Sequence, residues 1–384
     1  MKTGQDRILT THVGSLPRTD EVLAALERRE SSDGGDGAEI SDTIRRGVEI
    51  AVKRQVETGI DIVSDGETGK VSYATYVKDR LTGFSDEGST EPLKPHLDLA
   101  PFPELRRKMG LLTGPRRFKR VVCIGPVAVR DLAGLQRDLA NMRRAVTAAH
   151  PFDAFLNSAS PGVVASFLPN GYYPSHEDYV TAIADAMREE YPAIVAAGFI
   201  IQIDCPDLAM SRHAGFQDLS EAAFLKRAQL HAELLNHALA GISPDRVRMH
   251  VCWGNYEGPH THDLDLPKIL PTILSVKAQG LSLEAANPRH EHEWAIWKEV
   301  NLPDDKVLLP GVIDTSTNYV EHPELVAQRI LRLAQLVGRE RVIASTDCGF
   351  GTSAGHGKID PQVAYLKLGA LVEGAARASK RLWP

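Results

Sequence analysis

Eight apolar runs of strand length recur along the chain, and amphipathic stretches long enough for helices lie between many of them. The runs occupy residues 8–15, 61–67, 154–159, 199–205, 246–252, 280–286, 307–314 and 341–348. Helical patterns occupy residues 177–198, 222–241, 267–280 and 323–338. Alternating strands and helices predict a parallel sheet covered by helices. Eight such strands predict a closed (β/α)8 TIM barrel, and an open doubly wound sheet is the alternative.

The chain of 384 residues is longer than a typical barrel of this kind. Most of the excess falls in residues 68–153, which we interpret as an insertion between the second and third strands. Within it, residues 119–131 (KRVVCIGPVAVRD) predict an extra β excursion. We expect one catalytic barrel domain spanning residues 1–384, with the insertion inside it.

The charge balance argues against nucleic acid as a partner. Fifty acidic and 44 basic residues give a net charge of −6, whereas nucleic-acid binders usually carry a basic domain or stripe. No run of eighteen apolar residues occurs, so we expect no membrane-spanning helix. The N-terminal residues lack the apolar core of a secretory signal, and we expect a cytoplasmic protein.

Polar and thiol residues collect at the carboxyl ends of the expected strands, where barrels place their chemistry. His250 and Cys252 are two residues apart on one strand, so their side chains share a face. Glu284 ends the next strand, and Cys348 ends the last. Nitrogen, sulfur and oxygen donors of this kind suit a tetrahedral Zn²⁺ ion. Alternatively, the two cysteines are small core residues and Glu284 forms a salt bridge at the rim.

The remaining cysteines and several histidines have other interpretations. Four cysteines in this chain cannot form a disulfide framework. We interpret Cys123 as a packing residue, while Cys205 lies at a strand end, where an accessory thiol remains open. Two histidine pairs with i, i+2 spacing lie in polar sequence, and we expect surface positions for them. These are His260 with His262, and His290 with His292.

A zinc site with one exchangeable ligand can accept a substrate thiol. The cation favours the thiolate form near neutral pH, and a thiolate is a strong nucleophile toward an alkyl carbon. This chemistry needs no redox cofactor, which is consistent with a non-redox metal.

The strand-end motifs resemble the catalytic domain of cobalamin-independent methionine synthase. The motifs are HVGSLPR, SDGE, QIDCP, HVC, LSLEAAN, GVID and STDCG, and they occur in the family's order. The resemblance runs from about residue 9 to the C-terminus and supports His250, Cys252, Glu284 and Cys348 as zinc ligands. The single-barrel layout also resembles epoxyalkane:coenzyme M transferase, which joins a zinc-bound thiol to an epoxide.

Carried over by position, the resemblance implies substrate-binding residues. Ser15 takes the place where the amino-acid carboxylate is bound, and Glu67 and Asp204 flank the amino group. Two carboxylates suit an ammonium group, and a hydroxyl with nearby backbone N–H groups suits a carboxylate. Glu67 and Asp204 are alternatively rim ion-pair partners of Arg18, Lys70 or Arg212.

One departure from the family concerns proton transfer. The family's D-I-H-S segment appears here as residues 314–317 (DTST), so its histidine is missing and Asp314 becomes the expected proton donor. The sequence therefore predicts a zinc-dependent thiol alkyltransferase whose partners are a small-molecule thiol and an alkyl donor. Homocysteine methylation with a 5-methyltetrahydrofolate-type donor comes first, and epoxide opening second. A non-catalytic zinc protein and a metal-free tetrapyrrole decarboxylase are the alternatives of other classes.

Overall fold

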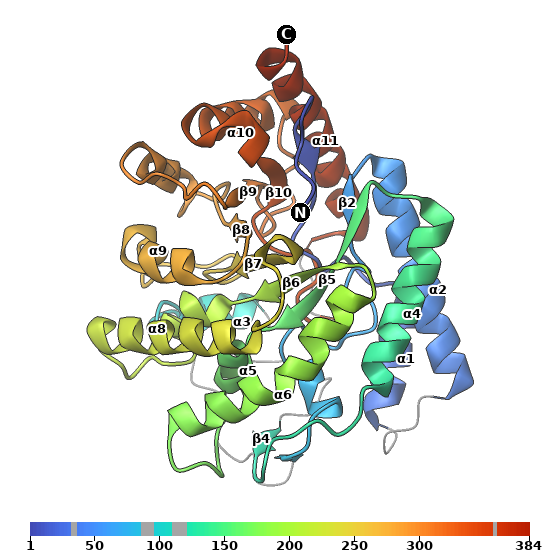
Figure 1. The fold of residues 1–384 in the computed structure, drawn as a ribbon, viewed down its shortest axis with the longest axis vertical. Coiled ribbons are helices and arrows are strands. Elements are labelled where there is room, and N and C mark those ends of the chain that lie inside the picture. Colours follow the sequence, from blue (N-terminus) through green and yellow to red (C-terminus); the bar gives the residue numbers. More distant parts are fainter. Residues whose placement is uncertain (32–36, 86–95, 110–120, 356–358) are drawn as a thin grey trace.

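Eight short parallel strands form the centre of the molecule, and helices surround them (Figure 1). The computed structural model describes residues 1–31, 37–85, 96–109, 121–355 and 359–384. The strands are hydrogen-bonded in the order β1-β10-β9-β8-β7-β6-β5-β2, and every pair in this order is parallel. Their bounds are β1 Leu9–Thr10, β2 Ile62–Val63, β5 Asp153–Ala159, β6 Ile200–Asp204, β7 Val247–Val251, β8 Gly280–Leu283, β9 Val307–Ile313 and β10 Ile343–Thr346.

Hydrogen bonds beyond the regular ladder bring the two ends of this sheet together. The Asp61 backbone N–H donates to the Thr10 carbonyl at 3.2 Å, and the Thr11 hydroxyl donates to the Ile62 carbonyl at 2.9 Å. The sheet is therefore a nearly closed barrel, as the eight apolar runs predict. The doubly wound alternative is wrong, because no edge separates β1 from β2.

The outer layer consists of helices that follow the strands in the chain. Their bounds are α1 Asp20–Ser31, α2 Ala38–Thr58, α4 Ala133–Ala149, α5 Pro161–Phe167, α6 His176–Ala196, α8 Glu221–Ala238, α9 Leu266–Ser275, α10 Pro323–Val337 and α11 Pro361–Leu382. Side-chain caps begin several of them: Ser175 accepts from the Asp178 N–H, and Ser220 from the Ala223 N–H. None of the described helices is long and apolar enough to cross a membrane.

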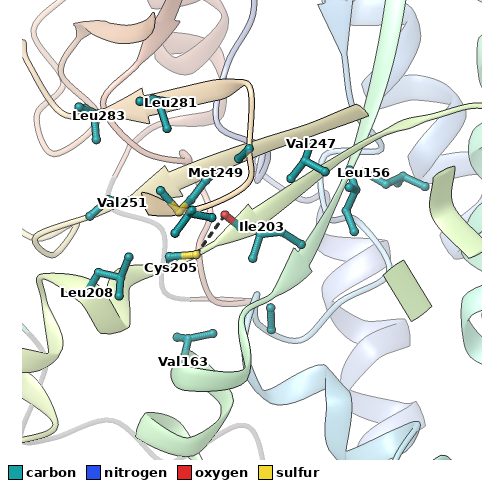
Figure 2. Packing of buried hydrophobic residues seen from close by; sticks show 14 of the residues in the cluster. Leu156, Val163, Ile203, Cys205, Leu208, Val247, Met249, Val251, Leu281 and Leu283 are labelled. Atoms are coloured by element: carbon teal, nitrogen blue, oxygen red, sulfur yellow. Dashed lines mark hydrogen bonds between the residues drawn. The ribbon is translucent and has the colours of Figure 1, made fainter. Parts of the chain in front are cut away.

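The alternation of side chains along β7 explains how the barrel separates its core from its interior. Val247, Met249 and Val251 pack into the hydrophobic layer between the sheet and the helices (Figure 2). Arg248 lies on the other face, where its guanidinium donates to the Thr11 hydroxyl at 3.0 Å. Because β1 and β7 are not neighbours in the sheet, this bond crosses the barrel interior.

The barrel interior is apolar at the amino ends of the strands and polar above them. A small hydrophobic cluster fills the lower interior and comprises Leu9, Ile62, Phe155, Ile200, Val307, Leu309 and Ile343. The Arg248 guanidinium lies over the Phe155 ring, 3.7 Å from its centroid, and donates to Gln202 at 2.6 Å. This fully buried polar layer supports the residues at the carboxyl ends of the strands.

Several elements lie between β2 and β5, where the sequence predicts an insertion over residues 68–153. The short strands β3 (Phe84–Ser85) and β4 (Val122–Cys123) pair antiparallel, which agrees with the expected β excursion. The helix α4 packs against α2 in the outer layer, so the predicted range also contains a helix of the barrel itself. Residues 86–95 and 110–120 of this range lie outside the described residues. The extent of the insertion and the domain bounds remain predictions.

Candidate functional site

The carboxyl ends of β7 and β10 bring a histidine and two cysteines together. His250 follows Arg248 on the inner face of β7, and Cys252 is the first residue after the strand. The pairing register between β10 and β9 shifts at Ser345 and Thr346, just before Cys348. Such an irregularity re-aims the side chains that follow it. As a result, the Cys348 and Cys252 sulfurs lie 3.6 Å apart, and both thiols are buried.

We call His250, Cys252 and Cys348 the thiol cluster, and its donors fit a zinc ion. Each residue offers one ligand atom, and these atoms lie within 4.8 Å of one another. Zn–S bonds of about 2.3 Å in a tetrahedral site hold two sulfurs roughly 3.8 Å apart. Among the described residues, neither ring nitrogen of His250 has a hydrogen-bond partner of normal geometry, although the Ser282 backbone lies beside the ring. Burial lowers the pKa of His250 to about 3, so the imidazole is neutral, as a metal ligand must be.

Glu284 comes directly after β8 and reaches Cys252, but hydrogen bonds occupy both of its oxygens. The Trp253 backbone N–H donates to Oε1 and the Asn287 amide donates to Oε2, each at 2.8 Å. No lysine or arginine pairs with Glu284 in the described part of the chain, so the rim salt bridge is not found. The carboxylate is also not among the ligand atoms that lie within 4.8 Å of one another. Its assignment as a fourth ligand remains a prediction. It requires that a bond to the metal replaces one of these hydrogen bonds.

Asp347 organises the loop after β8, and sequence reasoning missed it. Its Oδ1 accepts from the Ala285 and Ala286 N–H groups at 2.8 and 2.9 Å, and its Oδ2 accepts from the Asn287 N–H at 2.8 Å. Burial raises the pKa of Asp347 to about 6, and hydrogen bonds from the Ala285 and Ala286 N–H groups and from the Asn287 side chain counteract that effect. Asp347 and Cys348 are adjacent in the chain. Cys348 supplies a thiol of the cluster, and Asp347 orders the loop after β8.

Cys205 and Cys123 are core residues. Figure 2 shows Cys205 among Leu208, Val163 and Met249, with its thiol directed at the Ile203 carbonyl 3.7 Å away. The side chain is fully buried, and burial raises the pKa of the thiol well above its ordinary value. An accessory role for this thiol at the site is therefore wrong. Cys205 continues the set of β6 positions whose side chains face away from the barrel interior, so it packs against helices. Cys123 is fully buried as well.

Glu67 and Asp204 form a second buried group at the mouth, which we call the carboxylate pair. Asp204 ends β6 and accepts from Gln202 at 2.7 Å and from Asn157 at 3.0 Å. Among the described residues, Oε2 of Glu67 has no partner. Burial raises the pKa of Glu67 to about 8, and the charge of Asp204 adds to this effect. Burial also raises the pKa of Asp204 to about 6.

The alternative of a rim ion pair is not what the described residues show. Arg18 donates to the backbone carbonyls of Glu67 and Lys70, at 2.8 and 2.9 Å, and the Lys70 ammonium donates to the Asn157 carbonyl. Neither cation forms an ion pair with the Glu67 or Asp204 carboxylate in the described chain. Glu67 has a left-handed backbone with φ of 52°, which a non-glycine residue adopts at an energetic cost.

Ser15 lies against the loop that follows Cys348. The Gly351 N–H donates to the Ser15 hydroxyl at 3.3 Å, and the Phe350 N–H donates to the Ser15 carbonyl at 2.8 Å. A Cβ at Gly349 would stand 1.9 Å from the Ser15 oxygen, so only glycine permits this approach. The serine hydroxyl thus lies beside the Gly351 N–H, and its role in binding a carboxylate remains a prediction.

Tyr73 lies within electrostatic reach of both the thiol cluster and the carboxylate pair, and sequence reasoning missed it. Burial raises the pKa of its phenol well above the ordinary value, and the charges of Cys252, Cys348, Asp204 and Glu67 follow as further causes. Because the charges of both groups act on one phenol, the two groups lie near each other. No motif marked Tyr73, because it belongs to a loop rather than a strand end.

Asp314 lies at the end of β9 but is engaged within its own turn. Its Oδ1 accepts from the Ser316 N–H and hydroxyl at 2.9 and 2.7 Å, and its Oδ2 accepts from Thr317 at 2.6 Å. Its role as proton donor remains a prediction. The same turn borders a cleft of about 630 Å³, lined by Lys108, Met109, Glu257, Ser316, Thr317, Asn318 and Tyr319.

The histidine pairs divide in a way that the sequence did not predict. His262 and His292 are exposed as expected. His260 and His290 are 8% and 3% exposed, and both rings contact the Asp263 carboxylate at 3.0 Å. The expectation of surface positions is therefore wrong for these two, because the Asp263 carboxylate, which lies in the loop of His260, offers both rings a partner.

Proteins of similar sequence include two kinds of enzyme. A methionine synthase from Saccharolobus islandicus (strain L.S.2.15 / Lassen #1) is 24% identical over 368 residues, covering 95% of this chain and 93% of that protein. A 2-hydroxypropyl-CoM lyase from Xanthobacter autotrophicus (strain ATCC BAA-1158 / Py2) is 26% identical over an alignment of 403 positions, covering 97% of this chain and 95% of that protein.

A solved structure and a family model agree with this similarity. The structure of a B12-independent methionine synthase from Shewanella sp. W3-18-1, in complex with selenomethionine, has the same fold, with a TM-score of 0.74. It is 21% identical, and the match covers 98% of this chain and 99% of that chain. Residues 8–91 and 136–372 match the family model described as cobalamin-independent synthase, catalytic domain. This match spans most of the sequence, and the chain therefore belongs to the cobalamin-independent synthase catalytic-domain family.

Proposed function

We propose that this chain is a zinc-dependent transferase that methylates the thiol of homocysteine. The observation that carries the proposal is the buried carboxylate pair close to the thiol cluster, near enough for the charges of both groups to act on the Tyr73 phenol. A thiol at the cluster and an ammonium at the pair are the two reactive ends of one small amino acid. The methionine synthase from Saccharolobus islandicus supports this choice of substrate by its name.

His250, Cys252 and Cys348 would hold the zinc ion, with Glu284 as the proposed fourth ligand. When bound, zinc would keep a substrate thiol in the nucleophilic thiolate form near neutral pH. Cys252 and Cys348 would supply negative charge that increases the reactivity of that sulfur. Thiolate ligands require reduced cysteines, which supports the cytoplasm as the compartment of action.

The chain's own residues would fix the substrate's amino-acid end. Glu67 Oε2 and Asp204 would accept hydrogen bonds from the substrate ammonium, which would offset the repulsion between two buried carboxylates. The Ser15 hydroxyl and the neighbouring Gly351 N–H would receive the substrate carboxylate. Buried side chains at all three positions exclude water from the charged groups.

The first prediction concerns Asp204, because the ammonium contact distinguishes homocysteine from other thiols. Truncating one partner of a buried charge pair costs about 2 kcal/mol or more, or roughly 30-fold in binding. Asp204→Asn should therefore raise KM for homocysteine about 30-fold. Steady-state kinetics with the zinc-loaded protein measure this value.

The matched control is 4-mercaptobutyrate, which keeps the carboxylate and chain length of homocysteine but lacks its amino group. Its KM should change little in Asp204→Asn. Equal losses for both thiols would show that Asp204 acts through the fold and not on an ammonium, which would remove the main support for an amino-acid substrate.

Epoxide opening by a thiol is the second candidate, supported by the name of the Xanthobacter autotrophicus relative. The carboxylate pair favours a thiol substrate that carries an ammonium group and disfavours one without it, such as the anionic coenzyme M. The cleft beside the Asp314 turn is a proposed place for the alkyl donor, whether a methylfolate-type molecule or an epoxide. A screen of homocysteine and coenzyme M against methyl and epoxide donors separates the two candidates by their products.

A non-catalytic zinc protein and a tetrapyrrole decarboxylase fit the described residues less well. A buried carboxylate with an unpartnered oxygen has no evident purpose in a purely structural zinc protein. Binding several tetrapyrrole carboxylates calls for arginines at the mouth, whereas Arg18 is engaged with backbone carbonyls. Zinc with no measurable thiol alkylation for any donor would favour the structural alternative.

A further inference from the structure

A second group of metal-ligand side chains lies in the loops at the barrel mouth. His96 and Asp98 belong to the turn before α3 (Pro103–Lys108), and His213 belongs to the short helix α7 (Ser211–Ala214) that follows β6. Each of the three residues offers one nitrogen or oxygen atom, and these atoms lie within 4.8 Å of one another. We call this group the imidazole–carboxylate cluster. It contains no thiol, so it is chemically distinct from the thiol cluster.

The backbone fixes this juxtaposition. The Leu97 N–H donates to the carbonyl of His213 at 3.0 Å, so the residue that supplies one ring also anchors the turn carrying the other two ligands. The Leu99 and Ala100 N–H groups donate to the His96 carbonyl at 3.0 and 2.9 Å, which closes the turn. The three side chains therefore converge from an ordered scaffold.

Asp98 has an oxygen with no partner, although it is only 1% exposed. The Tyr256 hydroxyl and the His260 N–H both donate to Oδ2, at 2.6 and 2.9 Å. Among the described residues, Oδ1 accepts no hydrogen bond, and no lysine or arginine forms an ion pair with this carboxylate. Burying a carboxylate is costly unless a cation compensates for its charge.

His213 is fully buried and carries a carboxylate behind its ring. Its Nδ1 lies 3.4 Å from Oδ1 of Asp263, without a hydrogen bond of normal geometry. Asp263 in turn contacts His260 Nδ1 and His290 Nε2, each at 3.0 Å. Histidines that bind metals usually have such a carboxylate partner at the ring nitrogen that does not bind.

We propose that His96, Asp98 and His213 form a second metal site, which binds a divalent first-row transition ion through two imidazole nitrogens and one carboxylate oxygen. This donor set suits zinc, which takes two histidines and a carboxylate in other proteins, and it leaves at least one coordination position open. The ion would supply the positive charge that buried Asp98 lacks and would fasten the 96–98 turn to α7. The proposal does not depend on the proposed alkyl transfer, because it concerns a different donor set.

A titration of the chelator-treated full chain with Co²⁺ tests the proposal, because cobalt reports its ligands in its absorption spectrum. The wild type should bind two equivalents: one with sulfur-to-cobalt charge-transfer bands, and one with only the weaker bands of nitrogen and oxygen ligands. His213→Gln and Asp98→Asn should each lose the second equivalent and retain the sulfur bands. Cys252→Ser should lose the sulfur bands and retain the second equivalent.

The matched control is His262→Gln, which removes an exposed histidine from the neighbouring loop and should bind like the wild type. A wild type that binds one equivalent, or a second equivalent that persists in both His213→Gln and Asp98→Asn, would overturn the proposal. If His213→Gln does not fold, the stoichiometries of Asp98→Asn and of the wild type still test the second metal site. X-ray absorption of zinc-loaded Cys252→Ser should show only nitrogen and oxygen ligands.

Discussion

The thiol cluster and the imidazole–carboxylate cluster lie at the same mouth of the barrel but are built differently. The first stands at strand ends: His250 and Cys252 follow the period-two alternation of β7, and Cys348 follows an irregularity in the pairing of β10. The second comes from a turn and a short helix that are joined by backbone hydrogen bonds. A barrel can thus carry candidate ligands in its loops without altering its strands, and the two proposed sets would select metals of different character.

The two clusters also differ in what surrounds them. The thiol cluster has no acidic partner for its imidazole among the described residues, and Glu284 approaches it from the adjacent strand end. The other cluster is embedded in a network in which Asp263 contacts three histidines. We therefore expect substitutions in the first to act on chemistry, and substitutions in the second to act mainly on the order of the mouth.

The largest effect is expected for Cys348→Ser. Loss of a direct ligand should exceed the 10- to 100-fold losses seen when outer partners of a metal site are removed. Zinc retention should fall below measurable stoichiometry, and activity by more than about 100-fold. Metal analysis after gel filtration and a thiol alkylation assay measure the two quantities.

Cys123→Ser is the control for that experiment. Cys123 is buried in β4 and belongs to neither cluster. It should keep its zinc and most of its activity, with only a modest loss of stability. Equal zinc loss in the two variants would mean that the ligand set is misassigned.

An intermediate effect is expected for Asp347→Asn, which tests how the strand end is ordered. Three backbone N–H groups and the Asn287 side-chain amide donate to this carboxylate. In the variant, the NH2 group of the asparagine would replace one accepting oxygen and would face N–H donors. Hydrogen bonds to charged groups contribute about 1.5–3 kcal/mol each, so we expect a loss of about 3 kcal/mol in unfolding free energy. Urea denaturation measures it, and a loss below about 0.5 kcal/mol would contradict the ordering role.

The smallest effect is expected for Tyr256→Phe, which removes one of the two donors to Asp98. The unfolding free energy should fall by about 1.5 kcal/mol, because a hydrogen bond to a buried carboxylate is lost while the ring remains. The Co²⁺ sulfur bands should be unchanged. Altered sulfur bands in this variant would show that the two clusters are not independent.

Strand alternation explains which parts of the molecule the sequence could predict. It placed the eight strands, and it placed His250 and Cys252 on one face, because a period of two is visible in a single strand. Strand alternation did not exclude Cys205 from the site. At a strand end, a shift of one position changes whether a side chain faces the barrel interior or the helices. Glu284 was expected among the ligands, yet its present contacts are to Trp253 and Asn287.

Residues outside the strands could not be predicted in the same way. Asp347, His96 and His213 are placed by contacts between segments that are distant in sequence, and no local period marks such contacts. His260 and His290 were expected at the surface because polar sequence surrounds them, whereas Asp263 draws both rings inward. The carboxylate pair was anticipated from a family resemblance rather than from spacing.

The proposed function requires that zinc at the thiol cluster accepts the thiol of an amino acid as an exchangeable ligand. X-ray absorption at the zinc edge, recorded on Asp98→Asn to leave only the thiol cluster loaded, tests it directly. Without substrate, we expect two sulfur ligands per zinc, and with homocysteine we expect three. An unchanged sulfur count in the presence of saturating homocysteine would show that the zinc does not accept this thiol.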